Sequence, residues 1–284
     1  MALITSRSNP KIKLIRSLHD RRSRHRTRLF LVEGPQLLEA ALAAGAGITL
    51  LAVAPELLGA GGKAMVRRAQ KHGDPALIEV TPQVLESISP RHWRPGVVAV
   101  VRQRFRTLDE LDARSDDCFV AAKEIGEPWS IGTILRSGDA VGGRGVILIG
   151  DSVDPYHPTA VRASLGAAFS QLVVRASFSD LRKWKSGTGC LIVGTSPDAA
   201  TDYRDARYPM PVVLLMGSER VGLSPEEQGI CDQVVRIPML GRCESHHVVV
   251  AAAIVLYEIA RQREPQASYG TTAKGMARLA GSGC

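Results

Sequence analysis

Two stretches near the carboxyl end combine residue types that can build a ligand pocket mainly from backbone. Residues 212–216 form an apolar run that leads into a glycine-rich turn, residues 217–222, which holds one acid, Glu219. A second apolar run stops at Pro238, and a polar loop follows before a helix that is expected to open behind Ser245. Glycine lets the backbone approach a ligand closely because it has no side chain. The pattern predicts a cofactor site made of turns at strand ends.

Other ligand chemistries find less support in the sequence. No strand is followed by G-x-G-x-x-G, and neither a G-x-x-x-x-G-K-[ST] loop nor a G-x-S-x-G nucleophile elbow occurs. Cys243, His246 and His247 lie close together, but zinc usually takes four ligands and no fourth is evident. We therefore expect no metal. The 5 cysteines form no C-x-x-C pair, so we expect them to be reduced.

Length and composition indicate the broad class of protein. A chain of 284 residues exceeds what one hydrophobic core usually organises, which predicts two domains. Mean hydropathy of +0.01 and 45% hydrophobic residues are typical of a soluble globular protein. The longest apolar run, residues 248–257, is too short to cross a bilayer, and the basic amino-terminal region does not resemble a signal peptide. We expect a cytoplasmic protein with no membrane association.

The positive charge is concentrated in the first third of the chain. Residues 1–105 contain 17 Lys and Arg against 7 Asp and Glu, whereas residues 106–284 contain 19 against 21. A dense basic run with few acids suits the phosphates of a nucleic acid, although a solvated helix face is the simpler alternative. The expected RNA-binding residues are Arg7, Lys11, Arg21, Arg22, Arg24, Arg26 and Arg28.

The first part of the chain is predicted to be a compact α/β/α domain, residues 1–105. It opens with an amphipathic helix that carries Ile12, Ile15 and Leu18 on one face, and strands and helices then alternate. The expected strands are 29–32, 48–53, 77–80 and 96–102, and the expected helices are 36–44, 63–72 and one from Pro82. Residues 106–117 are polar and rich in acids, which predicts a linker.

The second part, residues 118–265, is predicted to hold a mostly parallel sheet with helices on both faces. Continuous apolar runs separated by helical patterns are typical of such buried strands. These runs are 118–122, 145–149, 171–174, 190–193, 212–216 and 234–237. Because ligands of parallel sheets bind beyond the carboxyl ends of the strands, loops after three of these strands should meet at one site. The tail, residues 266–284, is rich in small and polar residues and is expected to be unstructured.

Three separated stretches, residues 130–142, 215–223 and 237–253, carry a family resemblance. They resemble motifs 1, 2 and 3 of the SpoU/TrmH RNA 2′-O-ribose methyltransferases of the SPOUT superfamily, in the family's order and spacing. The opening Arg-Ser-Asn-Pro at residues 7–10 is similar to the start of that family's N-terminal RNA-binding domain. The chain is identified as a member on these motifs together.

The resemblance implies a trefoil knot in the C-terminal domain, S-adenosylmethionine bent into the knot loops, and a homodimer. A helix over residues 248–263 would then pack into the knot and the dimer interface, although a plain core helix would show the same pattern. Contacts to the cofactor would come mostly from backbone. The expected cofactor-binding residues are Thr195, Gly217, Ile237, Met239 and His246.

The same resemblance assigns catalytic roles. Ribose 2′-O-methylation requires a hydroxyl of very high pKa to lose its proton as it attacks a methyl group. Arg136 matches the family's arginine, and because a guanidinium stays protonated, we expect it to hold the target phosphate and polarise the hydroxyl. Glu219 would orient these groups or order the motif 2 loop. The expected catalytic residues are Arg136, Glu219, Ser245, His247 and Ser130.

Two positions depart from the family's pattern. Ser130 stands where motif 1 usually has asparagine, and residues 245–247 read Ser-His-His where motif 3 usually reads Ser-Leu-Asn. Serine reaches less far than asparagine, and His247 can donate or accept a hydrogen bond depending on its tautomer. A well-placed His247 could also act as a base. The motif residues that are retained favour an active enzyme.

These features predict S-adenosylmethionine-dependent 2′-O-methylation of structured RNA. The N-terminal domain resembles that of the ribosomal members, which favours ribosomal RNA over transfer RNA. The alternative is a noncatalytic RNA-binding or ribosome-assembly protein that keeps the knotted fold, and the altered motif residues favour that alternative.

Overall fold

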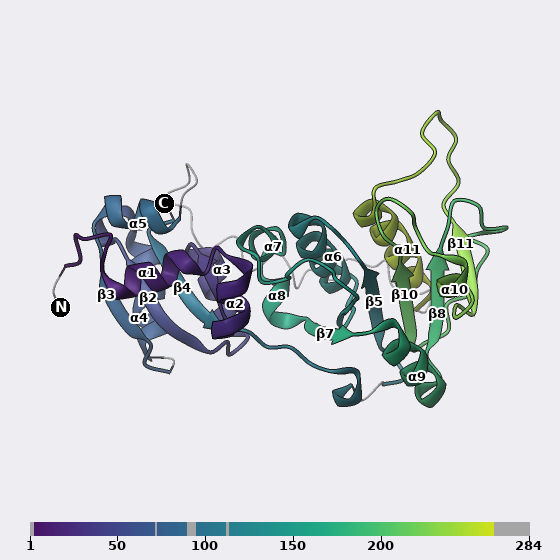
Figure 1. Cartoon of the computed structure of the whole chain (residues 1–284), viewed down its shortest axis with the longest axis horizontal. Helices are drawn as coiled ribbons and strands as arrows, with labels where there is room; N and C mark the ends of the chain where they lie inside the picture. Colours follow the sequence, from purple (N-terminus) through teal and green to yellow (C-terminus); the bar gives the residue numbers. More distant parts are fainter. Residues whose placement is uncertain (1–2, 72, 90–94, 112–113, 264–284) are drawn as a thin grey trace, which may run out of the picture.

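The computed structural model describes residues 3–263 except 72, 90–94 and 112–113. The chain forms a four-stranded sheet and then a seven-stranded sheet, which lie one after the other along the long axis of the molecule (Figure 1). Within the described residues, no helix is long and apolar enough to cross a membrane. The tail predicted over 266–284 lies outside the described residues.

The four-stranded sheet is mixed. Strand β4 runs antiparallel to both β1 and β2, and β2 runs parallel to β3. In spatial order the strands are β1 (Leu29–Glu33), β4 (Val97–Arg102), β2 (Ile48–Val53) and β3 (Ala76–Glu79). The helices of this part are α1 (Pro10–Ser17), α2 (Arg21–Thr27), α3 (Pro35–Ala43), η1 (Pro55–Leu57), α4 (Ala60–Lys71) and α5 (Pro82–Ile88).

Alternation along the strands explains the three layers of this part. Successive strand side chains point to opposite faces, so Leu50 packs in a cluster with residues of α1 and α5, while Leu51 packs with residues of α3 and α4. Ile12, Ile15 and Leu18 are fully buried, as their spacing predicts. The structure confirms the expected α/β/α arrangement. Helix α2, which carries the densest basic run, was not predicted.

All six neighbouring strand pairs of the described seven-stranded sheet are parallel. Its spatial order is β7 (Leu172–Ala176), β6 (Gly145–Ile149), β5 (Cys118–Lys123), β10 (Val212–Met216), β8 (Leu191–Thr195), β11 (Gln233–Arg236) and β9 (Thr201–Asp202). The prediction of a mostly parallel sheet is confirmed, and six of the strands match expected apolar runs. The short strand β9 is polar and was not predicted.

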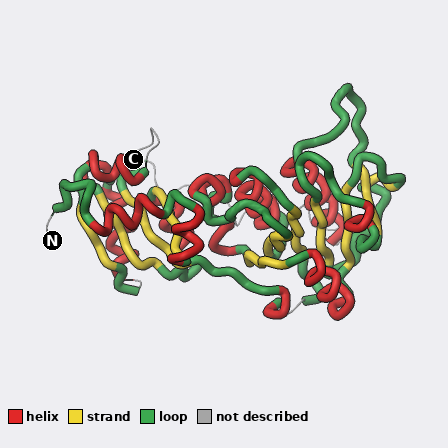
Figure 2. Tube along the Cα trace, viewed as in Figure 1, coloured by secondary structure: helices red, strands yellow, loops and turns green. Residues whose placement is uncertain are grey.

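Helices cover both faces of this sheet (Figure 2). One face packs against α6 (Pro128–Ala140), α8 (Ala167–Ser170) and α11 (Val248–Arg263). The other packs against η2 (Leu108–Glu110) and α9 (Phe178–Thr188). Two further helices are α7 (Pro158–Ala163), which contacts α6 and β1, and α10 (Pro225–Gln228).

The two sheets share one stretch of hydrophobic core. Tyr156, from the loop after β6, packs in the cluster of the first sheet, with its ring 4.5 Å from that of Phe30 and 5.0 Å from that of Phe105. Its hydroxyl donates to the carbonyl of Arg104 at 2.7 Å. The start of the expected linker is also packed, because Leu108 and Leu111 are buried against the second sheet. The domain limits stay a prediction, but the parts are joined by a core.

Candidate active site

One pocket forms where three adjacent parallel strands end. Strands β10, β8 and β11 are neighbours, so the loops that leave their carboxyl ends meet at one edge of the sheet. The pocket holds about 500 Å³. All five expected cofactor-binding residues line it, together with three of the expected catalytic residues. These are Thr195, Gly217, Ile237, Met239 and His246, and Glu219, Ser245 and His247.

The motif 2 turn closes tightly on itself beside this pocket. The amide of Gly222 donates to the carbonyl of Ser218 at 3.0 Å, and Gly222 adopts a φ of 71°, a conformation that favours glycine. A Cβ atom added at Gly217 would lie 2.2 Å from the carbonyl carbon of Gly222. The turn therefore requires glycine at both ends, and it presents Glu219 between them.

The motif 3 loop runs from β11 to α11 and projects from the body of the protein (Figure 2). His247 ends this loop and caps the helix. Its carbonyl accepts from the amides of Val250 and Ala251, and its Nδ1 accepts from the amide of Val249 at 3.3 Å. A ring nitrogen that accepts carries no proton, so in this arrangement the proton lies on Nε2. The helix begins at Val248, as the prediction of a helix over residues 248–263 has it.

A polar cluster centres on Glu219. The hydroxyl of Ser130 donates to Oε1 of Glu219 at 3.0 Å, and Nε2 of His247 lies 3.7 Å from the same oxygen. Ser130 is fully buried, whereas the side chains of His247 and Glu219 are 39% and 24% exposed. Helix α6 thus presents a hydroxyl donor, and the motif 3 loop an imidazole nitrogen, to the one carboxylate of the motif 2 loop. The two departures from the family pattern, Ser130 and His247, both point at Glu219.

Trp129 is a neighbour of this cluster that the sequence reading missed. Its ring stacks on that of His247, with centroids 4.7 Å apart and an interplanar angle of 29°. Trp129 is nevertheless 40% exposed. The signal in the sequence was a tryptophan directly before Ser130 of motif 1.

Arg136 does not line the pocket. It lies on the exposed side of α6 and has no hydrogen bond or ion pair within the described part of the chain. Arg136 follows Trp129 by seven residues, which places the two on the same helical face about 10 Å apart along the axis. A single chain therefore brings Ser130, Glu219, Ser245 and His247 together without Arg136.

No metal cluster is found in the parts of the chain that the structure describes. Groups of three or more His, Cys, Asp or Glu side chains that could hold an ion do not occur there. Cys243, His246 and His247 are exposed on the motif 3 loop. Burial raises the pKa of Cys118 to about 12 and that of Cys231 to about 11, so these thiols are poor ligands and poor nucleophiles.

Comparison with known proteins adds the family. The SpoU rRNA Methylase family matches residues 117–257, and the MRM3-like substrate binding domain matches residues 9–99. A 23S rRNA (uridine(2479)-2′-O)-methyltransferase of Streptomyces viridochromogenes is 36% identical over 193 residues, which cover 66% of this chain and 67% of that protein. The chain belongs to the SpoU rRNA methylase family. The predicted resemblance is confirmed.

Solved structures similar to this SpoU family chain agree in fold over nearly its whole length. An AdoMet-bound rRNA methyltransferase from Sinorhizobium meliloti superposes with a TM-score of 0.85 at 32% identity, covering 93% of this chain and 99% of that one. The SpoU methyltransferase AviRb from Streptomyces viridochromogenes, in complex with AdoMet, has a TM-score of 0.82 at 31% identity, covering 90% and 98%. The agreement spans both sheets.

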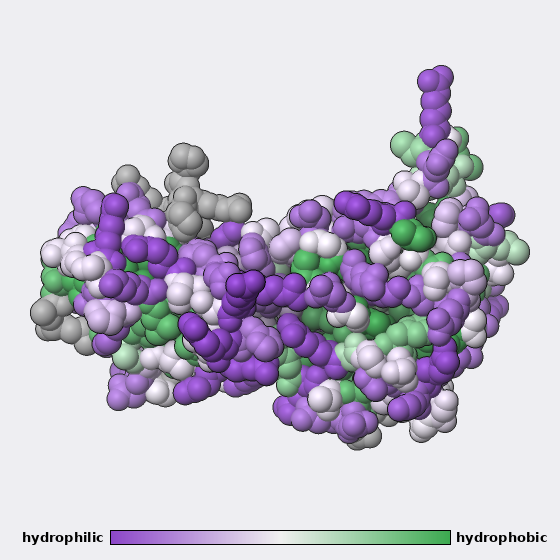
Figure 3. All heavy atoms as spheres, viewed as in Figure 1, coloured by the Kyte–Doolittle hydropathy of each residue, from purple (hydrophilic) through white to green (hydrophobic). Residues whose placement is uncertain are grey.

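The basic residues of the substrate-binding part divide into two groups. Arg7, Lys11, Arg21, Arg22, Arg26 and Arg28 are exposed. Arg24 is only 1% exposed, and its Nε donates to Asp154 at 2.7 Å. The expectation that Arg24 contacts RNA does not fit this position, because a dense basic run does not reveal which side chain turns inward. Figure 3 shows hydrophilic residues gathered where this part meets the second sheet.

Proposed function

We propose that this protein transfers a methyl group from S-adenosylmethionine to a ribose 2′-hydroxyl of structured RNA, with ribosomal RNA as the expected substrate. The observation that carries the proposal is the pocket at the ends of β10, β8 and β11, with Glu219 at its edge, in a chain of the SpoU family. Two relatives named as rRNA methyltransferases support the substrate, and two solved structures with AdoMet bound support the cofactor.

The residues of the pocket fit such a cofactor. Val235, Ile237 and Ala251 supply apolar surface, and the loops after Thr195 and Gly217 supply backbone amides and carbonyls. The missing side chain at Gly217 keeps the turn close, so the ligand faces main chain. When bound there, S-adenosylmethionine supplies an electrophilic methyl group.

Within this site Glu219 would accept a hydrogen bond from the ribose hydroxyl and align its oxygen for attack. Alignment of reacting groups can supply a large part of a rate enhancement. Ser130 donates to Glu219, and Nε2 of His247 lies 3.7 Å from the same carboxylate. His247 is thus arranged to donate, which does not favour the alternative that it acts as the base. Trp129 packs on the His247 ring and would hold its orientation.

We further propose that the active unit is a homodimer. Trp129, Val250 and Tyr257 expose 40%, 46% and 60% of their surface on α6 and α11, which pack together, and a second copy would bury them. Arg136 lies on the same side of α6 as Trp129, so in a dimer it could bind the target phosphate near a pocket edge. This assignment of Arg136 remains a prediction.

The knot is also part of the proposal. After β11, which lies next to the edge strand β9, the chain returns across the sheet, and α11 packs against α6 and β10. This return path is consistent with a chain threaded through its own loops. We expect the enzyme to act in the cytoplasm during ribosomal RNA processing.

Two measurements test the proposed function. Calorimetric titration should detect S-adenosylmethionine binding, and tritium transfer from labelled cofactor to protein-free ribosomal RNA should detect catalysis. Arg136→Ala is expected to bind the cofactor normally but to lose transfer about a hundredfold. Equal transfer by both proteins would refute the role of Arg136. Cofactor binding without any transfer to ribosomal or transfer RNA would favour the noncatalytic alternative.

A further inference from the structure

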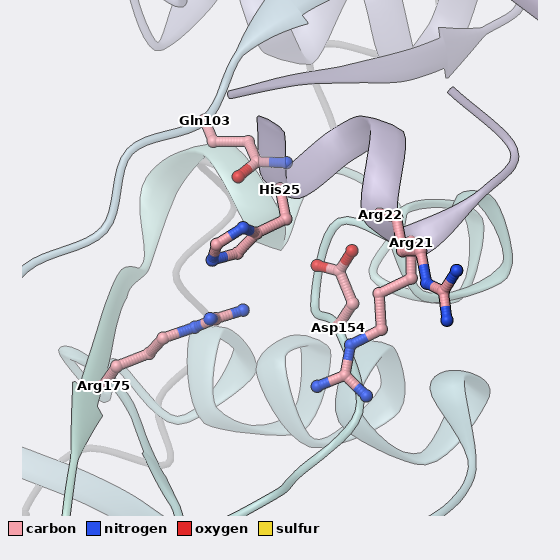
Figure 4. Close-up of a pocket in the computed structure, with 6 residues that line it drawn as sticks. All are labelled: Arg21, Arg22, His25, Gln103, Asp154 and Arg175. Carbon is pink, nitrogen blue, oxygen red and sulfur yellow. The ribbon is translucent and has the colours of Figure 1, made fainter. Parts of the chain in front are cut away.

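A second hollow lies between the two parts of the chain, away from the methyl-donor pocket. It holds about 330 Å³ and is lined by residues of α2, the segment after β4, the loop after β6, and β7 (Figure 4). A neighbouring hollow of about 320 Å³ shares Arg21 and Arg175 with it. We call this pair the junction groove. The six residues around its first hollow are Arg21, Arg22, His25, Gln103, Asp154 and Arg175.

Buried contacts hold the walls of the junction groove in place. Arg24 donates to Asp154 at 2.7 Å and to the carbonyls of Leu18 and His19 at 2.9 Å, which fixes α2 against the loop after β6. The amide nitrogen of Gln103 donates to the carbonyls of Arg24 and Leu29. Both partners of the Arg24 and Asp154 pair are buried, so the negative charge of Asp154 is already compensated.

The remaining charged groups leave the first hollow positive, whereas the second hollow is also lined by the carboxylates of Asp151 and Asp180. Within the described chain, neither Arg22 nor Arg175 has an ion pair, and Arg21 pairs only with the exposed Asp151 at 3.0 Å. Arg175 extends from β7 into the hollow toward His25 (Figure 4), and its guanidinium lies 4.1 Å from the centre of the Phe105 ring. This stacking holds the side chain in an extended position.

The electrostatic surroundings of Arg175 also favour an anion in the groove. Burial lowers the pKa of Arg175, Asp154 raises it, and the positive charges of Arg21 and Arg28 lower it further. The guanidinium remains protonated because its ordinary pKa lies far above neutral. Cationic neighbours that repel each other would each be stabilised by an anion bound between them.

We propose that the junction groove binds backbone phosphates of the RNA substrate, held jointly by α2 and by Arg175 of the second sheet. The inference rests on the proposed function, and it adds a substrate contact outside all three motifs. Guanidinium groups match phosphate oxygens with two parallel hydrogen bonds, and Arg22 and Arg175 are the two arginines that line the first hollow without an ion pair among the described residues. Phosphates fix register on a nucleic acid without reading its sequence.

The test is the affinity for protein-free large-subunit ribosomal RNA, measured by fluorescence anisotropy over a series of salt concentrations. Arg175→Gln and Arg22→Gln should each weaken binding and reduce the slope of log affinity against log salt by about 1, because each removes one phosphate contact. Arg207→Gln is the matched control, since Arg207 is exposed in the connection between β9 and β10. It should leave affinity and slope unchanged.

Cofactor binding separates failure of this inference from failure of the proposed function. All three variants should bind S-adenosylmethionine as the wild type does. If the wild type binds and methylates RNA while Arg175→Gln and Arg22→Gln match the Arg207→Gln control, the junction groove is not an RNA subsite. If the wild type neither binds nor methylates RNA, the proposed function fails and this inference fails with it.

Inorganic phosphate distinguishes a polynucleotide site from a site for free phosphate. At constant ionic strength, phosphate should compete only weakly with RNA, because a single phosphate lacks the neighbouring contacts of a chain. Strong protection of the wild type against thermal unfolding by millimolar phosphate, lost in Arg175→Gln without any change in the RNA salt slope, would overturn the RNA assignment.

Discussion

The methyl-donor pocket and the junction groove are built from different parts of the polypeptide. The pocket is formed by loops at the ends of three adjacent strands, and a glycine turn brings main chain to its surface. The junction groove is formed by long cationic side chains from α2 and β7, and a buried ion pair holds its walls in place. One site depends on backbone shape, and the other depends on charge and on how the two parts dock.

This difference predicts different sensitivities to mutation. A pocket made of tight turns tolerates few changes in its backbone, whereas a groove of arginines tolerates the loss of one charge with a graded loss of affinity. The residues that hold each site should therefore matter in different measurements: turnover for the pocket, salt dependence for the groove, and unfolding for the contacts that join them.

The largest effect is expected from Asp154→Ala, which leaves the buried Arg24 without its partner. Removing one member of a buried pair costs about 3–5 kcal/mol, and here both side chains are less than a tenth exposed. The free energy of unfolding should fall by that amount in urea titrations. Asp151→Ala is the control, because its pair with Arg21 is exposed and is worth at most about 1 kcal/mol. Similar losses in both variants would mean that Arg24 does not hold the junction.

The next effect separates turnover from RNA affinity. Glu219→Gln keeps the size of the side chain but removes the charge that Ser130 and His247 face, so methyl transfer should fall about a hundredfold. RNA affinity and its salt slope should not change, because the junction groove is intact. Glu244→Gln is the control, since Glu244 lines the same pocket and has no partner among the described residues. Full transfer by Glu219→Gln would remove Glu219 from the mechanism.

A smaller effect concerns the support of the motif 2 loop. Glu227 of α10 pairs with Lys123 of β5 and accepts from the amide of Ser224 at 2.8 Å. Burial raises the pKa of Glu227, but the hydrogen bonds from Lys123 and Ser224 outweigh it and the pKa is lowered overall from 4.5. A lowered pKa means that the carboxylate stabilises the fold above pH 4.5, and that this stabilisation is lost as pH falls through the folded-state value.

Glu227→Gln should therefore be less stable than the wild type by about 1–2 kcal/mol at pH 7, with the gap narrowing below pH 4.5. Urea titrations at pH 7 and below pH 4.5 measure this difference in the free energy of unfolding between the two proteins. Glu226→Gln is the control, because its ion pair with Arg182 has both side chains more than half exposed. A gap that stays constant with pH would show that the charge of Glu227 is not what supports the loop.

The sequence predicted the methyl-donor pocket better than the junction groove for a physical reason. Apolar runs such as 212–216 predict buried parallel strands, and the carboxyl ends of such strands must meet at one edge of a sheet. Glycines at 217 and 222 then mark the turn. The elements and their order could be predicted because each depends on local pattern.

The junction groove has no local pattern. Arg24 and Asp154 are separated by 130 residues in the sequence. The residues on either side of Arg175 in its strand are apolar. A run of arginines shows that a segment is basic. The way in which the two sheets pack together decides which guanidinium is buried and which is exposed to a ligand. The position of Arg136, outside the pocket of a single chain, could not be foreseen for a related reason. A motif identifies a residue but does not show toward which side of the helix its side chain points.

The ring of Tyr156 inside the core of the first sheet has a consequence for how a target nucleotide is chosen. Because aromatic packing and a buried ion pair lock the two sheets together, the spacing between the groove and the methyl-donor pocket is set by the fold. An RNA strand bound in the junction groove reaches the methyl-donor pocket only if a fixed number of nucleotides, with a fixed curvature, spans the distance between them. The enzyme would then select its target by the tertiary shape of the RNA rather than by its base sequence.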